Sequence, residues 1–223
     1  PSNGTASIVD NTKISYEPNA NFNGTDQLQY TVTDTGGASV NAQLDITVKS
    51  VNDAPSVADI SITINEDEVS VITPSITDVD ASDTHSLVLV TQADHGTVAI
   101  LDDNKFEYTP NANYFGTDSF SFKVRDSAGL EVLKSAQITV NSVNDIPVVA
   151  NQAVSTNEDV AILFVPAISD ADSSDTHSLQ ILSNPSNGTA SIVDNTKISY
   201  EPNANFNGTD QLQYTVTDTG GAS

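Results

Sequence analysis

The chain has 223 residues and contains no cysteine, methionine or tryptophan, which excludes disulfide bonds and thiolate or thioether metal sites. Seven basic residues stand against thirty acidic ones, a formal net charge of −23 at pH 7. This balance excludes the basic surfaces that bind nucleic acid or anionic membranes. No apolar run approaches the ~20 residues of a membrane span, so we expect no membrane insertion.

Short runs in which apolar and polar residues alternate occur along the whole chain and predict β-strands. In chain order they cover residues 28–33, 44–48, 60–64, 69–72, 87–91, 97–101, 106–109, 120–125 and 136–140. Turn-rich pieces such as 102–104 separate them, and no segment shows a sustained helical period. The spacing of the runs predicts an all-β protein of tandem seven-strand Greek-key sandwiches.

An internal repeat divides the chain. The stretch SVNDAPSVA at 50–58 returns as SVNDIPVVA at 142–150, and residues 185–223 repeat residues 1–39 letter for letter. The sequence therefore predicts three modules from an alternating array. Residues 1–54 are the C-terminal part of a repeat, 55–146 are complete, and 147–223 lack the last strand. Because the chain starts in the middle of a motif, we expect it to be part of something longer. We expect its cut ends to be completed by strand exchange between molecules or by a continuing filament.

Acidic loops are expected to meet where one sandwich joins the next. We letter the seven strands of a module A to G in chain order. In a Greek key, loops A–B and E–F lie at the end where the chain leaves, beside the Asn-Asp linker. Loop B–C and the end of strand F of the following module lie at its entry end. This places six carboxylates and one amide together at the second junction: Glu66, Asp118, Asp145, Asp170, Asp172, Asp218 and Asn144. Like charges in contact repel by about 1 kcal/mol even in water. We therefore expect Ca²⁺, which accepts six to eight oxygen ligands in irregular geometry.

Each acidic motif also has a plainer interpretation. Asp78-Val79-Asp80 could be a solvated loop, and the acids at 66–67 and 118 could belong to ordinary turns. Asp83 and Asp175 could be ligands or could cap the strand that follows them. The proline after each Asn-Asp pair keeps the linker extended, because the residue before proline avoids the helical region.

The combination of VNDAP, NEDE, DVDASDTHSL and YTPNANYFGTDSFSFKVRD resembles the bacterial cadherin-like (VNDAP-type) tandem repeats of giant surface adhesins, over essentially the whole chain. The resemblance implies sandwiches of cadherin/immunoglobulin-like type, end to end. It also implies that the seven residues named above bind calcium at the second junction. At the first junction it implies calcium ligands at Asp26, Asn52, Asp53, Asp78, Asp80 and Asp126. The linker departs from the longer animal cadherin motif, because only one Asp follows its Asn.

The resemblance also implies a function. We expect a calcium-stiffened extender of a bacterial cell-surface adhesin, extracellular and non-enzymatic, that projects a distal binding tip for attachment or biofilm formation. Neighbouring repeats of the chain are its expected partners, with end-to-end or strand-swapped self-association. The alternative is that the repeats themselves bind glycans or pair homotypically in cell–cell adhesion, which would need an exposed apolar or aromatic patch on the module faces.

Overall fold

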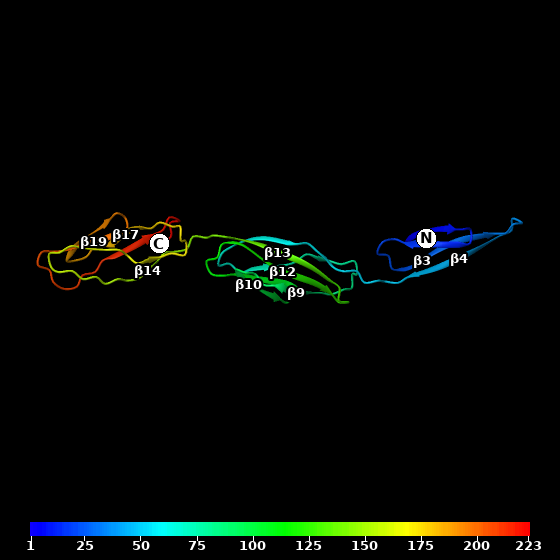
Figure 1. Ribbon diagram of the computed structural model, residues 1–223, viewed down its shortest axis with the longest axis horizontal. Coiled ribbons are helices and arrows are strands. Elements are labelled where there is room, and N and C mark those ends of the chain that lie inside the picture. The colour runs from blue at the N-terminus through cyan, green and yellow to red at the C-terminus, as the bar shows by residue number, and fades with distance from the viewer. The chain divides into compact units, whose positions relative to one another are not determined.

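The structure is a computed structural model that describes residues 1–223, and its regular elements are all β-strands (Figure 1). It has no helix with the length and apolar character needed to span a membrane. The chain separates into two compact units, 1–62 with 69–109 and 117–139, and 63–68 with 110–116 and 140–223. The boundary between these units runs through residues 55–146, so the three-module division stays a prediction.

Residues 55–146 form the predicted pair of sheets. One sheet has the strand order β10-β11-β7 and the other β6-β13-β12-β9. Both are antiparallel where the register is given, as for β12 with β9 and β11 with β7. The order is that of a Greek-key sandwich, so the predicted fold class is confirmed. The strands are β5 (Ser56–Val57), β6 (Ile60–Asn65), β7 (Ser70–Ile72), β8 (Ile76–Thr77), β9 (His85–Thr91), β10 (Gly96–Leu101), β11 (Lys105–Pro110), β12 (Gly116–Asp126) and β13 (Glu131–Asn141).

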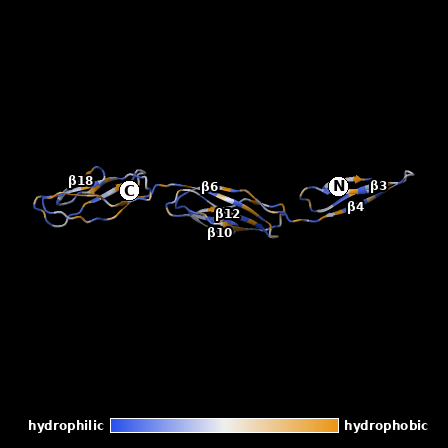
Figure 2. Ribbon diagram, in the orientation of Figure 1, coloured by the Kyte–Doolittle hydropathy of each residue, from blue (hydrophilic) through white to orange (hydrophobic).

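The core of this sandwich follows from the two-residue period of its strands, along which apolar and polar residues alternate (Figure 2). Successive side chains of a strand point to opposite faces, so Phe120, Phe122 and Val124 of β12 all face inward and are buried. The ring of Phe106 on β11 lies edge-on to both Phe120 and Phe122, with ring centroids 5.1 Å apart in each pair. Such pairs add to the free energy gained from burial alone.

Residues 1–54 form only two separate two-stranded sheets. Strand β1 (Gly4–Val9) pairs with β2 (Lys13–Pro18), and β3 (Gly24–Thr33) pairs with β4 (Ser39–Val48). Asp10 and Asn11 turn the first hairpin with φ of 50° and 54°, the left-handed pair that a tight turn between twisted strands requires. Most side chains of this segment are exposed, because neither two-stranded sheet has a second sheet paired or packed into a core with it.

Residues 147–223 form a sandwich with a smaller strand set. The sheets are β15-β19-β18, β17-β20 and the short pair β14-β16. Leu179, Ile198 and Val216 are its buried centre, and Phe164 and Tyr214 pack against them. The strands are β14 (Val148–Val149), β15 (Ile162–Phe164), β16 (Ile168–Ser169), β17 (Ser178–Ser183), β18 (Gly188–Val193), β19 (Lys197–Pro202) and β20 (Gln213–Thr217).

Candidate metal centres

The first Asn-Asp linker is tied to two acidic loops by hydrogen bonds. Asn52 donates from Nδ2 to Oδ2 of Asp126 at 2.8 Å, and the backbone N–H of Asp53 donates to Oδ2 of Asp80 at 2.8 Å. The N–H of Asp80 in turn donates to Oδ1 of Asp78 at 3.0 Å. Residues far apart in sequence therefore meet around the linker, and calcium binding by Asn52, Asp53, Asp78, Asp80 and Asp126 stays a prediction.

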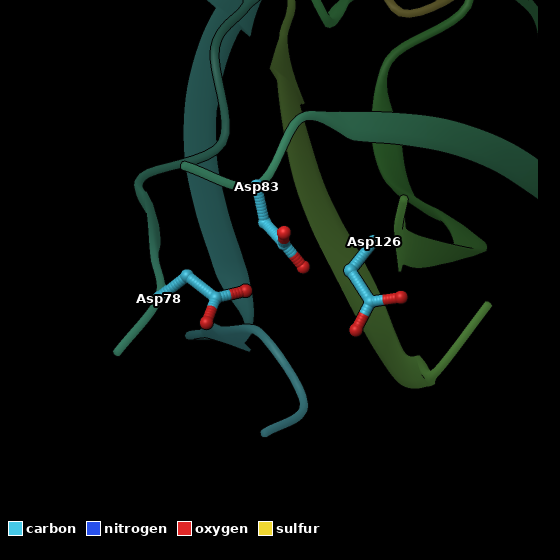
Figure 3. A group of neighbouring side chains, drawn as sticks. All are labelled: Asp78, Asp83 and Asp126. Atoms are coloured by element: carbon cyan, nitrogen blue, oxygen red, sulfur yellow. The ribbon is translucent and has the colours of Figure 1, made fainter. Parts of the chain in front are cut away.

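Asp83 also belongs to this group of residues, and three of its carboxylates lie especially close together. We call the whole group the first acidic cluster: Asn52, Asp53, Asp78, Asp80, Asp83 and Asp126. Asp78, Asp83 and Asp126 each place a carboxylate oxygen within 4.8 Å of the other two, and Figure 3 shows the three side chains turned toward a common space. Asp78 and Asp83 come from the loop between β8 and β9, and Asp126 ends β12. Asp126 is buried, so its charge cannot be dispersed fully into water.

Local donors keep two acids of this cluster ionised. The hydrogen bond from His85 Nε2, 2.9 Å from Asp78 Oδ2, and the N–H of Asp80 hold the pKa of Asp78 below its ordinary value. The Asn52 amide and the backbone N–H groups of 128–130 do the same for the pKa of Asp126. Asp78 and Asp126 therefore carry their charges at neutral pH, the state in which carboxylates bind cations.

The second acidic cluster repeats this geometry: Glu66, Asn144, Asp145, Asp170, Asp172, Asp175 and Asp218. Asn144 donates to Oδ2 of Asp218 at 2.9 Å, and the N–H of Asp145 donates to Oδ2 of Asp172 at 2.7 Å. Asp170, Asp175 and Asp218 bring one oxygen each within 4.8 Å of one another. The β8–β9 loop with the end of β12, and the β16–β17 loop with the residue after β20, thus build the same arrangement twice.

Asp145 lies among several other acids of the second acidic cluster. Burial raises the pKa of its carboxyl group, and the charges of Asp172, Asp67, Glu66 and Asp170 raise it further. Glu66 is itself buried and accepts a hydrogen bond from the N–H of Val143 at 2.7 Å, so it is held beside the linker. The equivalent linker acid of the first cluster, Asp53, is exposed.

Several buried oxygens of these clusters have no hydrogen-bond partner. They are Oδ2 of Asp83, of Asp145 and of Asp175. A buried carboxylate oxygen without a donor is costly, because it has lost water and gained nothing in return. A divalent cation bound in each cluster would give these oxygens a partner, Asp83 in the first cluster and Asp145 and Asp175 in the second. The donor set is all oxygen, which fits Ca²⁺ better than metals that prefer nitrogen or sulfur.

Two predicted ligands have a different role. Asp118 is buried. Its Oδ1 accepts from the N–H groups of Asp94 and Ser119, and its Oδ2 accepts from the N–H of His95 and the hydroxyl of Tyr108, at 2.8–3.1 Å. Each oxygen therefore already accepts two hydrogen bonds, and the carboxylate ties the β12 start to the turn before β10.

Asp26 makes the same set of bonds, with Ser2, Asn3, Tyr16 and Gln27. We correct the sequence prediction on this ground and leave Asp26 and Asp118 out of both clusters.

Asp83 and Asp175 are the acids that sequence reasoning left undecided. In the structure each lies inside a cluster with an unpartnered oxygen. The sequence feature that pointed to a shared role was the recurrence of Asp83 as Asp175, 92 residues later, in an otherwise matching loop. What the sequence could not show is the distance to Asp126 or Asp218, which sit more than forty residues away on another strand.

Known proteins share the family and the fold of this chain. The family model described as the bacterial Ig domain matches residues 1–47, 52–141 and 144–223. The chain is 29 % identical over 215 residues to integrin beta-like protein A of Dictyostelium discoideum, which aligns 86 % of this chain with 11 % of that protein.

Two solved structures of protocadherin ectodomains share the fold. Protocadherin gammaB7, in a structure of its EC3-6 cis-dimer, has a TM-score of 0.57 and 18 % identity over 98 % of this chain. Extracellular cadherin domains 3-6 of protocadherin gamma B2 have a TM-score of 0.54 and 17 % identity over 100 % of it. The chain spans 62 % of each of these protocadherin chains. At this identity the likeness shows a cadherin-like sandwich fold.

Proposed function

Since this chain belongs to the bacterial Ig domain family, we propose that it is a calcium-stiffened extender of a large bacterial cell-surface adhesin. In this role it projects a distal binding tip away from the cell for attachment or biofilm formation. The tandem repeats, the cadherin-like fold and the similarity to an integrin beta-like protein support an extracellular role of the adhesion type.

The observation that carries the proposal is the set of unpartnered, buried carboxylate oxygens at Asp83, Asp145 and Asp175. Each belongs to an acidic cluster built around an Asn-Asp linker. In the first cluster the ion would be held by Asn52, Asp53, Asp78, Asp80, Asp83 and Asp126, with the amide nitrogen of Asn52 also positioning Asp126. In the second cluster it would be held by Glu66, Asn144, Asp145, Asp170, Asp172, Asp175 and Asp218, with Asn144 positioning Asp218 in the same way. When bound, Ca²⁺ supplies positive charge and a shared coordination shell.

The residues of the chain explain why such an ion would stiffen it. The linker pieces 49–54 and 141–146 have no regular structure of their own apart from the final residue of β13, and they contribute acids to the clusters. Without a cation, the acids of a cluster repel one another and favour open arrangements of the linker. With a cation, linker and loop oxygens are held in one place, and the linker loses its freedom to rotate.

Calcium titration of the full chain tests this proposal. We expect Ca²⁺ addition at pH 7 to give a heat of binding from both clusters. Asp83→Asn should lower the calcium affinity of the first cluster at least tenfold, and Asp175→Asn should do the same for the second cluster. The matched control is Asp102→Asn, which changes the same charge in an exposed turn and leaves binding unchanged. Small-angle scattering of the wild-type chain then shows greater flexibility after chelation.

Two results would count against the proposal. Identical scattering with and without chelator would exclude calcium stiffening. Specific retention of this chain on a glycan array would instead favour repeats that act as the binding modules themselves.

A further inference from the structure

One loop of the fold occurs three times, between β2 and β3, between β11 and β12, and between β19 and β20. In each copy one asparagine has a positive φ, at Asn21, Asn113 and Asn205. The N–H of the aromatic residue that follows donates to the backbone oxygen three residues before it, at 3.0–3.1 Å. Two residues later comes a glycine with φ of 130–142°, a region that glycine adopts without strain. The backbone of the loop is therefore the same in all three copies.

The residue just before that glycine differs among the copies. It is Asn23 in the first copy and Asn207 in the third, but Phe115 in the second. Because Phe115 belongs to a loop with the same backbone, the loop does not need an asparagine at this position. The turn accounts for Asn21 and its counterparts, since asparagine tolerates the left-handed region. It does not account for Asn23 and Asn207.

Asn23 and Asn207 each begin the sequence Asn-Gly-Thr, which fits the acceptor pattern for N-linked glycosylation. Both asparagines are exposed, and so are the threonines two residues after them. In the sandwich formed by residues 55–146, Phe115 at the same position is 57 % exposed. The position therefore faces solvent in each copy of the loop, as an acceptor for an enzyme must.

The same three letters also occur just before the first hairpin of each copy, at Asn3 and Asn187, which we call the hairpin sites. The backbone N–H of Asn187 donates to Oδ2 of Asp210 at 2.8 Å, and its carbonyl oxygen accepts from the N–H of Asn203 at 2.9 Å. Asn3 makes the equivalent pair of bonds. Both residues are only partly exposed. A backbone held on two sides makes these amides harder for an enzyme to reach than amides in an exposed loop.

We propose that Asn23 and Asn207, the loop sites, are acceptors for an N-linked glycan, and that the hairpin sites are not. In the transfer, Nδ2 of the asparagine forms a bond to C1 of the sugar while the bond from C1 to the phosphate of a glycosyl diphosphate breaks. The diphosphate leaves with the electron pair, and the amide loses one proton. The chain supplies the acceptor, a glycosyltransferase is the partner, and calcium has no part in the step.

The two loop sites lie 184 residues apart, and the loop between them carries Phe115. Glycans on the loop sites would therefore mark every second copy of the loop. The sugar donor is a glycosyl diphosphate whether its diphosphate is joined to a nucleoside or to a lipid. A single hexose on the site would point to the nucleoside-linked donor, and a preassembled oligosaccharide to the lipid-linked one.

Mass spectrometry of tryptic peptides tests the proposal on the chain produced in its native host. Trypsin cuts after lysine, and four lysines place the four Asn-Gly-Thr sequences in different peptides: Lys13, Lys49, Lys134 and Lys197. We expect at least one hexose on each loop site, and at least tenfold lower occupancy on each hairpin site.

Two variants separate glycosylation from the deamidation that Asn-Gly sequences undergo without an enzyme. Thr25→Ala destroys the acceptor pattern but keeps Asn23 and Gly24, so it should abolish the glycan on Asn23 and leave the glycan on Asn207. Deamidation depends on the glycine and would continue. Phe115→Asn changes an exposed side chain and completes the acceptor pattern in the second copy of the loop, so it should add a glycan there.

Four results would overturn the proposal. They are loop sites that are unmodified or only deamidated, equal occupancy of loop and hairpin sites, a glycan that persists on Asn23 in Thr25→Ala, and no glycan at position 115 in Phe115→Asn.

Discussion

Residues 1–39 and 185–223 have the same sequence but are packed differently. Their first hairpins are the same, since Gly4–Val9 and Lys13–Pro18 match Gly188–Val193 and Lys197–Pro202 strand for strand. The turns match too, with positive φ at Asp10 and Asn11 and again at Asp194 and Asn195. Asp26 and Asp210 accept hydrogen bonds from equivalent donors.

Burial separates the two copies. Val32 is 55 % exposed and its counterpart Val216 is 4 % exposed, because Val216 packs in a core with Ile198 of the other sheet, whereas Val32 lies on a two-stranded sheet without such a core. Asp34 is exposed and Asp218 is buried, because only Asp218 receives the amide of Asn144. The comparison teaches that hairpins and turns follow local sequence, whereas the core and the acidic clusters require strands from elsewhere in the chain.

The largest difference in stability between the two copies is expected when the equivalent valine of each copy is replaced by aspartate. Val216→Asp buries a charge in an apolar core and should lower the free energy of unfolding of the C-terminal sandwich by about 3–5 kcal/mol. Val32→Asp should change stability by less than about 0.5 kcal/mol, as surface substitutions do. Hydrogen exchange of β17 amides reports the first effect, and equal protection in both variants would break the comparison.

A smaller difference is expected from removing one methyl group. Ile198 is fully buried and its counterpart Ile14 is only half-buried. Ile198→Val should cost about 0.5–1.5 kcal/mol, and Ile14→Val should cost less. Denaturant unfolding of both variants measures the two costs, and a larger cost for Ile14→Val would contradict the assignment of the core.

Removing the Asn144 amide should affect only one copy. Burial opposes ionisation of Asp218, but the bonds from Asn144 and from the N–H groups of 220–222 hold its pKa below the ordinary value. Asn144→Ala should therefore raise the pKa of Asp218, as followed by carboxyl NMR signals. The signals of residues 34–38 should not move, and a matching shift there would show that the two sites are not independent.

The smallest difference between copies is expected on acidification. Asp26 is buried, which opposes ionisation, yet the N–H groups of 2, 3 and 27 and the Tyr16 hydroxyl lower its pKa from 3.8 to about 2. The pKa of Asp210 is lowered by the same kinds of bond. A carboxyl group whose pKa is lowered by folding stabilises the folded state at any pH above its ordinary pKa. This stabilisation is lost as the pH falls from about 4 toward 2.

Amide exchange of residues 2–3 and 186–187 should therefore accelerate together over that range. Loss of protection in one copy at a much higher pH than in the other would show that tertiary context controls these bonds.

The amino-acid sequence by itself determined the strands, the turns and the repeat. Alternation along 120–125 predicted the centre of β12. The strand in the structure is longer, Gly116–Asp126, because β13 and β9 pair with it on both sides. The sequence also placed acids at the Asn-Asp linkers, since Greek-key order assigns each loop to one end of a sandwich. These features depend on neighbours in the chain or on rules of topology.

Only the tertiary structure decided which acids act together. Asp118 accepts a hydrogen bond from Tyr108, whereas Asp83 lies in one acidic cluster with Asp78 and Asp126. In the sequence, Asp118 and Asp83 look alike, because both are acids in turn-like stretches. Their roles depend on distances of a few ångströms between oxygen and donor atoms on strands far apart in sequence, and hydrogen bonds and charge repulsion change steeply over such distances. For the same reason two identical stretches of 39 residues differ in burial: their sequence is the same, and the strands that pack against them are not.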